Sequence, residues 1–324
     1  MGAELCSSIA DRGASRVVLV DQAEAPLVER ANTLRSGALG TDVVPVLADI
    51  RHPARVAQIL DEHRPHVVFH AAAYKQVPLL EAFPVEGVAT NVLGTKNVVD
   101  AARRAGVERF VLFSSDKAVR PTNVLGRTKA LAECIVAAVG REEGRPGYVS
   151  VRLGNVADSA GSILPVFRRQ IARGGPVTVT HPHMTRYLMT AGEAAALAIV
   201  AGGIAEANEA FVLDVGRPVR ILDIANRLAR AASLDVAIDF VGLRAGERLH
   251  EELFWDDDDV AETSCVGVLA SPLPVVHPAR LADWIDELSH DVATSSPARA
   301  RAALSQIDWG RSSREVVGEA VAAG

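Results

Sequence analysis

The sequence predicts an α/β protein with a doubly wound parallel sheet and a smaller C-terminal α/β lobe. Short β-branched runs alternate with helical patterns over the first 150 residues, which is typical of parallel strands covered by helices on both faces. Hydrophobic residues make up 49% of the 324-residue chain and aromatic residues 4%, so Val, Leu, Ile and Ala must build the core. Glycines stand where helices are expected to end: Gly13, Gly40, Gly106 and Gly140.

In chain order, the sequence begins with a helical pattern at Glu4–Arg12 and then alternates. Five apolar runs have the length of buried strands: Val17–Val20, Val43–Leu47, His66–His70, Arg109–Phe113 and Tyr148–Leu153. The segments between them carry helical patterns: Ala23–Arg35, Pro53–Glu62, Val85–Ala105 and Gly126–Val139. We expect residues 1–160 to form the sheet domain.

The rhythm changes after residue 160. Helices are predicted at Ser162–Arg173, Ala191–Ala201 and Ile221–Ala232, and short strands at Val177–Thr180, Phe211–Leu213 and Ala237–Val241. We expect residues 161–290 to form a substrate-binding lobe that is interleaved with the sheet domain. Residues 291–324 are rich in Ala, Arg and Ser and predict a helical tail of one or two loosely packed helices.

Composition excludes several classes of protein. The formal net charge is −6, which excludes binding of nucleic acid through bulk positive charge. The longest apolar run, Ala194–Ala205, is too short to span a bilayer, and the first residues lack the pattern of a signal peptide. Three widely spaced cysteines form no Cys-x-x-Cys pair, which disfavours a disulfide framework or zinc site and fits a reducing cytoplasm: Cys6, Cys134 and Cys265.

Lysine is rare in this chain. Only four of the 34 basic residues are lysines, and the rest are arginines: Lys75, Lys96, Lys117 and Lys129. Such a bias is typical of a GC-rich genome, which replaces surface lysine by arginine. A lysine retained against that bias marks a position where an amine can act as a base, because the pKa of arginine does not fall far enough.

The first 21 residues contain part of a dinucleotide-binding unit. Such a unit runs strand, glycine turn, helix, strand and acidic residue. Gly2 stands where the last glycine of the turn belongs, and Asp21 follows it by 19 positions, close to the usual spacing of about 20. We therefore expect Asp21 to bind the adenosine ribose of NAD, although an Asp after a strand also serves as a turn or cap residue. NADP is the alternative cofactor, because Arg12 and Arg16 lie nearby.

The first strand of that unit and its earlier glycines are absent from the sequence. In this fold the first strand lies between the second and the fourth, so its absence would leave two unpaired inner edges and remove the turn that holds phosphate. We expect Met1 to be an internal residue of a longer glycine-rich turn. If it is not, we expect poor retention of the cofactor.

The segment Ser114–Lys129 has the densest set of reactive side chains. It follows the strand Arg109–Phe113 and so leaves the carboxyl edge of the sheet, where open α/β sheets bind ligands. It offers hydroxyl groups, a carboxylate and two of the four lysines. The alternative is a surface loop with a helix cap, which accounts for the Ser and Asp residues but not for both lysines.

These residues resemble the extended short-chain dehydrogenase/reductases, specifically the bacterial UDP-N-acetylglucosamine 4,6-dehydratases. The resemblance covers Gly2 to Phe254. Its motifs are His70-Ala71-Ala72-Ala73-Tyr74-Lys75, Thr90-Asn91-Val92-Leu93-Gly94-Thr95, Ser115 to Lys129, Arg152-Leu153-Gly154-Asn155-Val156, Thr178-Val179-Thr180-His181-Pro182, Met184-Thr185-Arg186-Tyr187 and Gly242-Leu243-Arg244-Ala245-Gly246-Glu247. The resemblance implies a Rossmann-type sheet and a UDP-N-acetylhexosamine as substrate.

The reaction that the resemblance implies has three stages. Hydride leaves sugar C4 for the nicotinamide, water is lost across C5 and C6, and the hydride returns to C6. By the resemblance, Asp116 is the acid toward the C6 hydroxyl, Lys117 is the C5 base, Ser115 lies near the C4 hydroxyl, and Lys129 holds the nicotinamide ribose. Burial and a nearby positive charge are expected to lower the pKa of Lys117, and burial is expected to keep Asp116 protonated.

One departure from the wider superfamily bears on the reaction. The Tyr of its Tyr-x-x-x-Lys motif is Leu125 here, whereas the Lys is present as Lys129. An apolar residue also occurs at this position in the membrane-anchored dehydratase branch. Leu125 argues against a sugar 4-epimerase, which relies on that Tyr. Two alternatives stay open: such an epimerase, and a catalytically impaired protein that binds nucleotide sugars.

The resemblance implies further site residues. On the cofactor side these are Gly2, Asp21, Asp49, Ala71 and Ala72, with Asp49 as an equally plausible helix cap. On the substrate side they are Lys75, Asn155, Arg186, Arg244 and Glu247, the two arginines as pyrophosphate clamps. Relatives usually differ at Gln76, Ala245, Arg248 and His250, which bears on the identity of the sugar.

Neither candidate metal site is favoured, and we expect no metal. The His181-Pro182-His183 spacing belongs to a family loop without metal, and the run Asp256–Asp259 lacks the glycine and spaced ligands of a calcium loop. Lys96, in a predicted helix, is expected to be an ordinary surface residue. By the resemblance, we expect a homo-oligomer.

Overall fold

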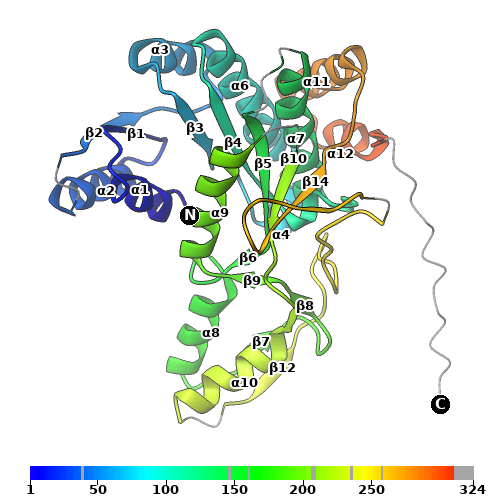
Figure 1. The fold of residues 1–324 in the computed structure, drawn as a ribbon. Helices are drawn as coiled ribbons and strands as arrows, with labels where there is room; N and C mark the ends of the chain where they lie inside the picture. The colour runs from blue at the N-terminus through cyan, green and yellow to red at the C-terminus, as the bar shows by residue number, and fades with distance from the viewer. Residues whose placement is uncertain are drawn as a thin grey trace.

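The structure is a computed structural model that describes residues 1–37, 40–142, 144, 147–159, 161–205, 209–233, 236–256 and 258–309. Its main sheet has six strands in the order β13-β14-β10-β5-β4-β3 (Figure 1). Their bounds are β3 Val67–His70, β4 Arg109–Ser115, β5 Tyr148–Leu153, β10 Glu209–Leu213, β13 Ala261–Glu262 and β14 Val268–Pro272. The four strands β3, β4, β5 and β10 are parallel, and β14 and β13 continue the sheet antiparallel. The prediction of a mostly parallel α/β sheet is confirmed.

The sheet is in two pieces. Strands β1 (Arg16–Asp21) and β2 (Asp42–Leu47) form a separate parallel pair. Within the described residues, β1 pairs only with β2 and β3 pairs only with β4, as expected for a chain without the strand that would lie between them. Val20 on β1 and Val67 on β3 are 41% and 37% exposed. Helix α1 (Gly2–Ala10) links the pieces because it packs on α9 (Ala191–Ile204) of the main unit.

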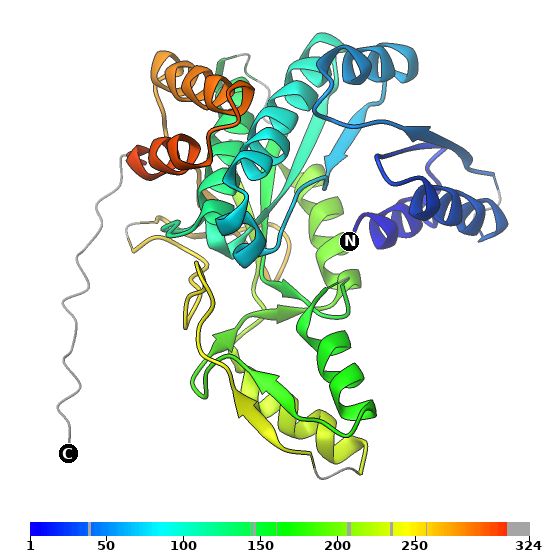
Figure 2. The same cartoon turned by 180° about the vertical axis from the view of Figure 1, so that it is seen from behind.

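Helices cover both faces of the main sheet. Helix α9 packs on β4, β5 and β10 from one side, whereas α6 (Thr95–Arg104) and α7 (Val124–Glu142) pack on the other (Figure 2). Two further helices lie outside this layer: α3 (Pro53–His63) packs on α6, and α2 (Glu24–Gly37) packs on β1 and β2. Each face has its own apolar cluster, around Leu112 and Leu131 on one side and Phe113 and Leu197 on the other.

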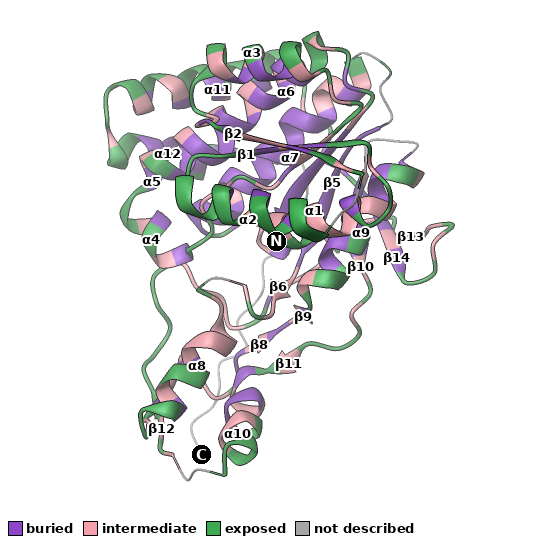
Figure 3. Ribbon diagram, turned by 90° about the vertical axis from the view of Figure 1, so that its left-hand side faces the viewer, coloured by how far each residue is buried: buried purple, intermediate pink, exposed green. Residues whose placement is uncertain are grey.

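The C-terminal helices belong to the core. Helices α11 (Pro278–Ala293) and α12 (Pro297–Gln306) pack on α7 and on α5 (Pro84–Gly87). They contribute Leu288, Ala300 and Leu304, each at most 1% exposed, to the largest apolar cluster (Figure 3). The expectation of loosely packed helices after residue 291 is therefore wrong for α12, because its apolar face covers the helix layer of the sheet. Most of α11 falls in the range expected for the substrate-binding lobe, but it packs on the same layer. Residues 310–324 of the predicted tail lie outside the described residues.

A second lobe lies at the carboxyl end of the main sheet (Figures 1 and 2). Helices α8 (Ile163–Ala172) and α10 (Ile221–Ala231) pack on the parallel pair β7 (Val177–Val179) and β12 (Ile238–Phe240). Two short pairs join it to the sheet: β6 (Asn155–Val156) with β9 (Leu188–Met189), and β8 (Thr185–Arg186) with β11 (Val219–Arg220). Strands β10 and β14 fall in the sequence range of this lobe but return to the main sheet.

The helix predicted at Val85–Ala105 is divided into three parts. A π-helical segment, η1 (Val88–Gly94), lies between α5 and α6. Such segments occur frequently at functional sites. No helix among the described residues is long and apolar enough to cross a membrane.

Candidate active site

The predicted catalytic residues lie together where β4 ends. Ser115 is the last residue of β4, and the 3-10 turn η2 (Asp116–Ala118) follows directly. The Ser115 hydroxyl donates to Oδ1 of Asp116 at 2.8 Å and accepts from the backbone N–H of Lys117 at 3.3 Å. The Asp116 side chain is fully buried, and its Oδ2 has no hydrogen-bond partner in the described part of the chain. The turn therefore presents a hydroxyl, a carboxylate and an amine at the carboxyl edge of the sheet.

Lys117 is held by carboxylates. Its Nζ donates to Oδ1 of Asp116 at 3.0 Å and lies 3.4 Å from Oε1 of Glu251. Burial lowers the pKa of Lys117, but the charges of Asp116 and Glu251 raise it by more, so the net shift is upward. The expectation of a lowered pKa is therefore wrong in this structure, because two carboxylates face the amine from within 3.5 Å.

Lys129 has the opposite environment. It lies on α7, one turn after the buried Leu125, and its Nζ donates to the carbonyl oxygen of Phe113 at 2.8 Å. Burial lowers the pKa of Lys129 to about 8, although Glu133 counteracts the shift. The chain thus holds one amine with a raised pKa and another with a lowered pKa at the same edge of the sheet.

The start of α7 fixes the catalytic turn. Oδ1 of Asn123 accepts from the backbone N–H of Gly126 at 2.8 Å and so caps the helix, and its Nδ2 donates to the carbonyl oxygen of Gly246. A Cβ atom on Gly126 would lie 2.2 Å from the carbonyl oxygen of Lys117. Only glycine therefore allows α7 to pack directly on the turn that carries Lys117.

Four residues without a predicted role support this site. Asn91 in η1 accepts from the backbone N–H of Tyr74 at 2.9 Å and donates to Tyr74 O and to Thr128, so it ties the loop after β3 to α7. His70 is buried and bonds Thr95 at 2.9 Å, and Glu251 faces Lys117. Asn91, His70 and Thr95 belong to the motifs that carry the family resemblance, and those motifs could have identified them as site residues. Glu251 had no comparable signal, since its partner is distant in the sequence.

The predicted cofactor residues follow the carboxyl ends of β1, β2 and β3. Asp21 ends β1; its Oδ1 accepts from the backbone N–H of Ala23, which leaves Oδ2 for a ribose hydroxyl. Gly2 opens α1, and burial together with the charge of Lys75 lowers the pKa of the Met1 amino group just before it. Ala71 and Ala72 follow β3 directly. Asp21, Ala71 and Ala72 thus lie at the carboxyl edge of the strands, where open α/β sheets bind ligands.

Asp49 does not cap the helix that follows it. Its carboxylate accepts from the backbone N–H of Arg51 at 2.9 Å and from the Arg51 guanidinium, which holds the pKa of Asp49 below its usual value. The N-cap residue of α3 is His52, which makes no side-chain cap. The helix-cap alternative for Asp49 is therefore wrong.

Some of the predicted substrate-binding side chains have hydrogen-bond partners within the described residues, and others do not. Oδ1 of Asn155 is buried and has no hydrogen-bond partner among the described residues, so it is available to a ligand donor. Nζ of Lys75 donates to the hydroxyl of Ser159 at 3.2 Å, and burial lowers the pKa of Lys75. Both residues border the junction between the sheet and the second lobe.

The two predicted phosphate clamps differ. Arg186 is buried, and its guanidinium donates to the carbonyl oxygens of Thr185, Arg248 and Leu249 at 2.7–3.2 Å. This geometry favours a role in holding the segment around residue 249 over the predicted role as a clamp, because the terminal nitrogens already have acceptors. Arg244, by contrast, has a 63% exposed side chain.

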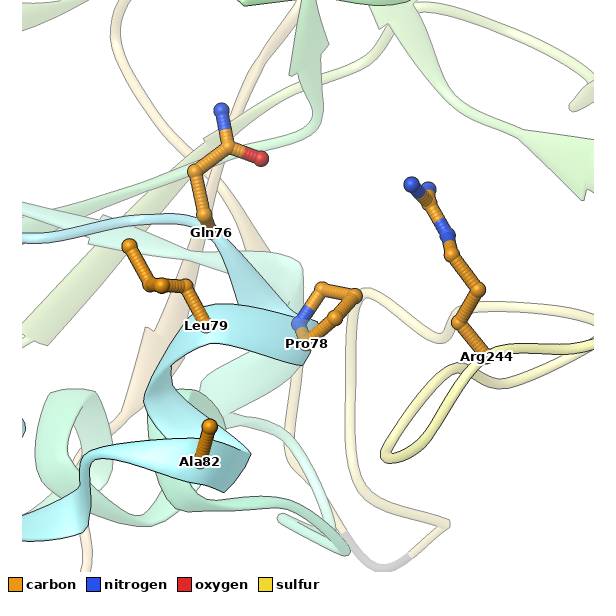
Figure 4. A pocket seen from close by; sticks show the side chains of 5 residues that line it. All are labelled: Gln76, Pro78, Leu79, Ala82 and Arg244. Carbon is orange, nitrogen blue, oxygen red and sulfur yellow. The ribbon is translucent and has the colours of Figure 1, made fainter.

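Arg244 and Glu247 bind each other. Nη2 and Nε of Arg244 lie 2.6 and 3.0 Å from Oε1 of Glu247. Arg244 also lines a cavity of about 380 Å³ opposite α4 (Val77–Ala82), with Gln76, Pro78, Leu79 and Ala82 on the other wall (Figure 4). This hollow is shallow and open to solvent, with apolar side chains on one wall and the exposed guanidinium of Arg244 on the other.

The described residues contain no group of three or more His, Cys, Asp or Glu side chains that could hold a metal ion. Nδ1 of His181 accepts from the backbone N–H of His183. In the acidic run, Asp258 accepts from the backbone N–H of Trp255, whereas Asp257 lies outside the described residues.

Comparison with known proteins places the chain in a family. Residues 1–271 match the family described as polysaccharide biosynthesis protein. The capsular polysaccharide biosynthesis protein CapD of Staphylococcus aureus is 43% identical over 258 residues, which are 78% of this chain and 43% of CapD. A UDP-glucose 4-epimerase of Rickettsia rickettsii is 37% identical over 210 residues, 64% of this chain and 60% of the epimerase. The chain thus spans less than two thirds of either relative.

Solved structures share the fold. Pen from Bacillus thuringiensis has a TM-score of 0.77 and 30% identity, over 84% of this chain and 85% of its own. The dTDP-glucose 4,6-dehydratase DesIV of Streptomyces venezuelae, solved with NAD bound, has a TM-score of 0.66 over 77% of this chain and 82% of its own; at 20% identity it shows the fold alone. The chain belongs to the polysaccharide biosynthesis protein family of extended short-chain dehydrogenase/reductases.

Proposed function

We propose that this protein dehydrates a UDP-N-acetylhexosamine, with UDP-N-acetylglucosamine as the favoured substrate, to a 4-keto-6-deoxy sugar nucleotide. The observation that carries the proposal is the buried contact between Asp116 and Lys117 at 3.0 Å, where β4 ends. Loss of water across two adjacent carbons needs an acid and a base close together, and this pair supplies one of each. The family description, polysaccharide biosynthesis protein, supports a role in making sugar precursors of polysaccharides.

The residues of this chain would take distinct parts. A bound nicotinamide would supply the hydride acceptor for C4 and the hydride donor for C6. Asp116 would donate a proton to the leaving C6 hydroxyl and Lys117 would accept the C5 proton, while Ser115 orients the C4 hydroxyl. Lys129 would hold the nicotinamide ribose. Leu125 cannot move a proton, so the C4 hydroxyl proton would go to Ser115 or water.

NAD fits this site better than NADP. A carboxylate at Asp21 accepts from a free 2′-hydroxyl and repels a 2′-phosphate. The two nearby arginines are engaged elsewhere: Arg12 donates to the carbonyl oxygen of Ser8 at 2.7 Å, and Arg16 pairs with Asp42 at 2.7 Å. Each guanidinium thus already has one partner other than a 2′-phosphate.

On the substrate side, we propose that Asn155, Lys75 and Arg244 bind the nucleotide phosphates and that Glu247 accepts from the uridine ribose. Glu247 must then exchange its bond to Arg244 for one to substrate. None of the three cysteines forms a disulfide in the described part of the chain, which suits a reducing compartment such as the cytoplasm. We further propose that the protein is a homo-oligomer and that the second lobe, built from α8, α10, β7 and β12, binds the substrate.

Incubation with UDP-N-acetylglucosamine and NAD tests the proposal. We expect a product lighter by one water, identified by mass spectrometry and NMR. Asp116→Asn and Lys117→Met should each lower the rate by about 10²–10⁴-fold, the usual contribution of an acid or base. Lys96→Met is the matched control, since Lys96 pairs with Asp100 on a helix surface. Unchanged substrate with cofactor-loaded protein would contradict the proposal.

The same assay separates the two alternatives. A 4-epimerase, the activity named for the Rickettsia relative, would give a product of unchanged mass. A catalytically impaired binding protein would bind the nucleotide sugar without changing it. Measuring nicotinamide bound after purification distinguishes it from the dehydratase.

A further inference from the structure

A second buried carboxylate lies beside the proposed base. Glu251 belongs to no helix or strand and is 5% exposed. Its Oε1 lies 3.4 Å from Nζ of Lys117 and 3.8 Å from Nη2 of Arg186. Its Oε2 is buried without a hydrogen-bond partner in the described part of the chain. Because removing a carboxylate from water is unfavourable unless it is paired, its position beside Lys117 needs a reason.

The segment that carries Glu251 is fastened to the catalytic turn and its surroundings. Arg248 lies within 3.4 Å of the carbonyl oxygens of Val119 and Arg120, and Arg186 binds the carbonyl oxygens of Arg248 and Leu249. These bonds tie residues 248 and 249 to the backbone that follows the turn and to Arg186 of β8. The contacts of Arg248 and Arg186 therefore place the Glu251 carboxylate next to Lys117 without involving Lys117 itself.

Charged groups face Glu251 from three elements. Lys117 and Asp116 belong to η2, Arg186 to β8, and Arg248 to the same segment as Glu251. Burial raises the pKa of Glu251, and the charge of Lys117 counteracts this. In return, the charge of Glu251 helps to raise the pKa of Lys117. The titrations of the Lys117 amine and the Glu251 carboxylate are therefore coupled.

We propose that Glu251 is a positioning residue that acts through Lys117: it holds the amine beside Asp116 and stabilises the ammonium form of Lys117. This role rests on the proposed dehydration only because that reaction makes Lys117 the base. Movement of one proton from Nζ of Lys117 to Oδ1 of Asp116 gives a neutral amine and a carboxylic acid, with no exchange with solvent. Lys117 then accepts the C5 proton and Asp116 gives its proton to the C6 hydroxyl, which leaves as water. Both groups thereby return to the protonation states from which the step began.

The small number of lysines makes a direct test practical. Protein grown with lysine labelled at Nζ and Cε gives four side-chain signals in NMR, and the Lys117 signal is assigned by its loss in Lys117→Arg. We expect Glu251→Gln to lower the pH at which Lys117 titrates by about 1–3 units, the usual effect of removing an adjacent opposite charge. Glu252→Gln is the matched control, because Glu252 pairs with Arg248 and Arg120 instead.

Two results would overturn the proposal: titration of Lys117 at the same pH in wild type and Glu251→Gln, or an equal shift in Glu252→Gln. If Glu251→Gln does not fold, Glu251→Asp keeps the charge but draws it back by one methylene, and a smaller downward shift is expected. The titration needs no substrate, so it stands even if dehydration fails. If the protein dehydrates UDP-N-acetylglucosamine, the high-pH limb of kcat should shift downward together with the NMR titration, because the reaction starts from the ammonium form of Lys117.

Discussion

The buried His70 makes the stability of this protein depend on pH. Its Nε2 lies 2.9 Å from the hydroxyl of Thr95, and that hydroxyl donates its own proton to the carbonyl oxygen of Asn91 at 2.7 Å. Thr95 can therefore only accept from the ring, which places the ring proton of His70 on Nε2. Burial, helped by the charge of Lys129, lowers the pKa of His70 from 6.5 to about 3.

The sign and size of the effect follow from that pKa. Between pH 6.5 and 3 the unfolded chain binds a proton at His70 that the folded protein does not bind, so stability falls as the pH falls. At about 1.4 kcal/mol per pKa unit, the full contribution is about 5 kcal/mol at pH 3. At pH 4.5 the loss from this one group is about 3 kcal/mol, a large part of a typical total of about 5–15 kcal/mol.

Substitution of His70 by Gln tests this reasoning. The Gln amide can still donate to Thr95 but does not titrate. We expect urea unfolding from pH 7 to pH 4.5 to show a free energy of unfolding that falls more steeply in wild type than in His70→Gln, by about 1.4 kcal/mol per pH unit below 6.5. His66→Gln, at an exposed histidine, should follow wild type. Parallel curves for wild type and His70→Gln would refute the argument.

Three further predictions concern single groups. Burial lowers the pKa of Lys129 from 10.5 to about 8, so between these two pH values the unfolded chain holds a proton that the folded protein has lost. Raising the pH from 8 to 10.5 should therefore stabilise wild type relative to Lys129→Met by up to about 3 kcal/mol, measured by urea unfolding. A difference that does not change with pH would contradict this. Arg152→Met should cost about 3–5 kcal/mol, because it leaves the buried Glu133 carboxylate, 2.9 Å away, without its partner; a melting temperature equal to wild type would contradict this. Gly126→Ala should cost about 1–3 kcal/mol and lower the dehydration rate, because the new Cβ displaces the carbonyl oxygen of Lys117; unchanged melting and rate would show that α7 can withdraw.

The central strands could be predicted from sequence because burial on both faces gives continuous apolar runs. The strand predicted at Tyr148–Leu153 has the bounds of β5. The strand predicted at Arg109–Phe113 begins where β4 begins and ends two residues before the end of β4. The expectation of two unpaired inner edges agrees with the described residues, in which β1 pairs only with β2 and β3 pairs only with β4. Strands β13 and β14 were missed, because their pairing depends on distant residues and their sequences alternate only weakly.

The catalytic turn could be predicted, but its electrostatics could not. Ser115, Asp116 and Lys117 are neighbours in sequence, so their proximity needs no tertiary information. The pKa of Lys117 depends on Glu251, which the fold brings to it from a distant segment. The hydrogen bonds from Arg186 to backbone carbonyl oxygens could not be predicted from the sequence either, because a guanidinium donates equally well to phosphate and to carbonyl oxygens.

The position of α11 and α12 has a consequence for how this protein can be dissected. The family match ends at residue 271, before either helix begins. Yet Leu288, Ala300 and Leu304 are almost completely buried against the helix layer. A fragment cut at the family boundary would present that apolar layer to water and would be expected to aggregate. The minimal folding unit therefore extends to Ile307, which is itself buried, and any shortened version for crystallisation or labelling should keep both helices.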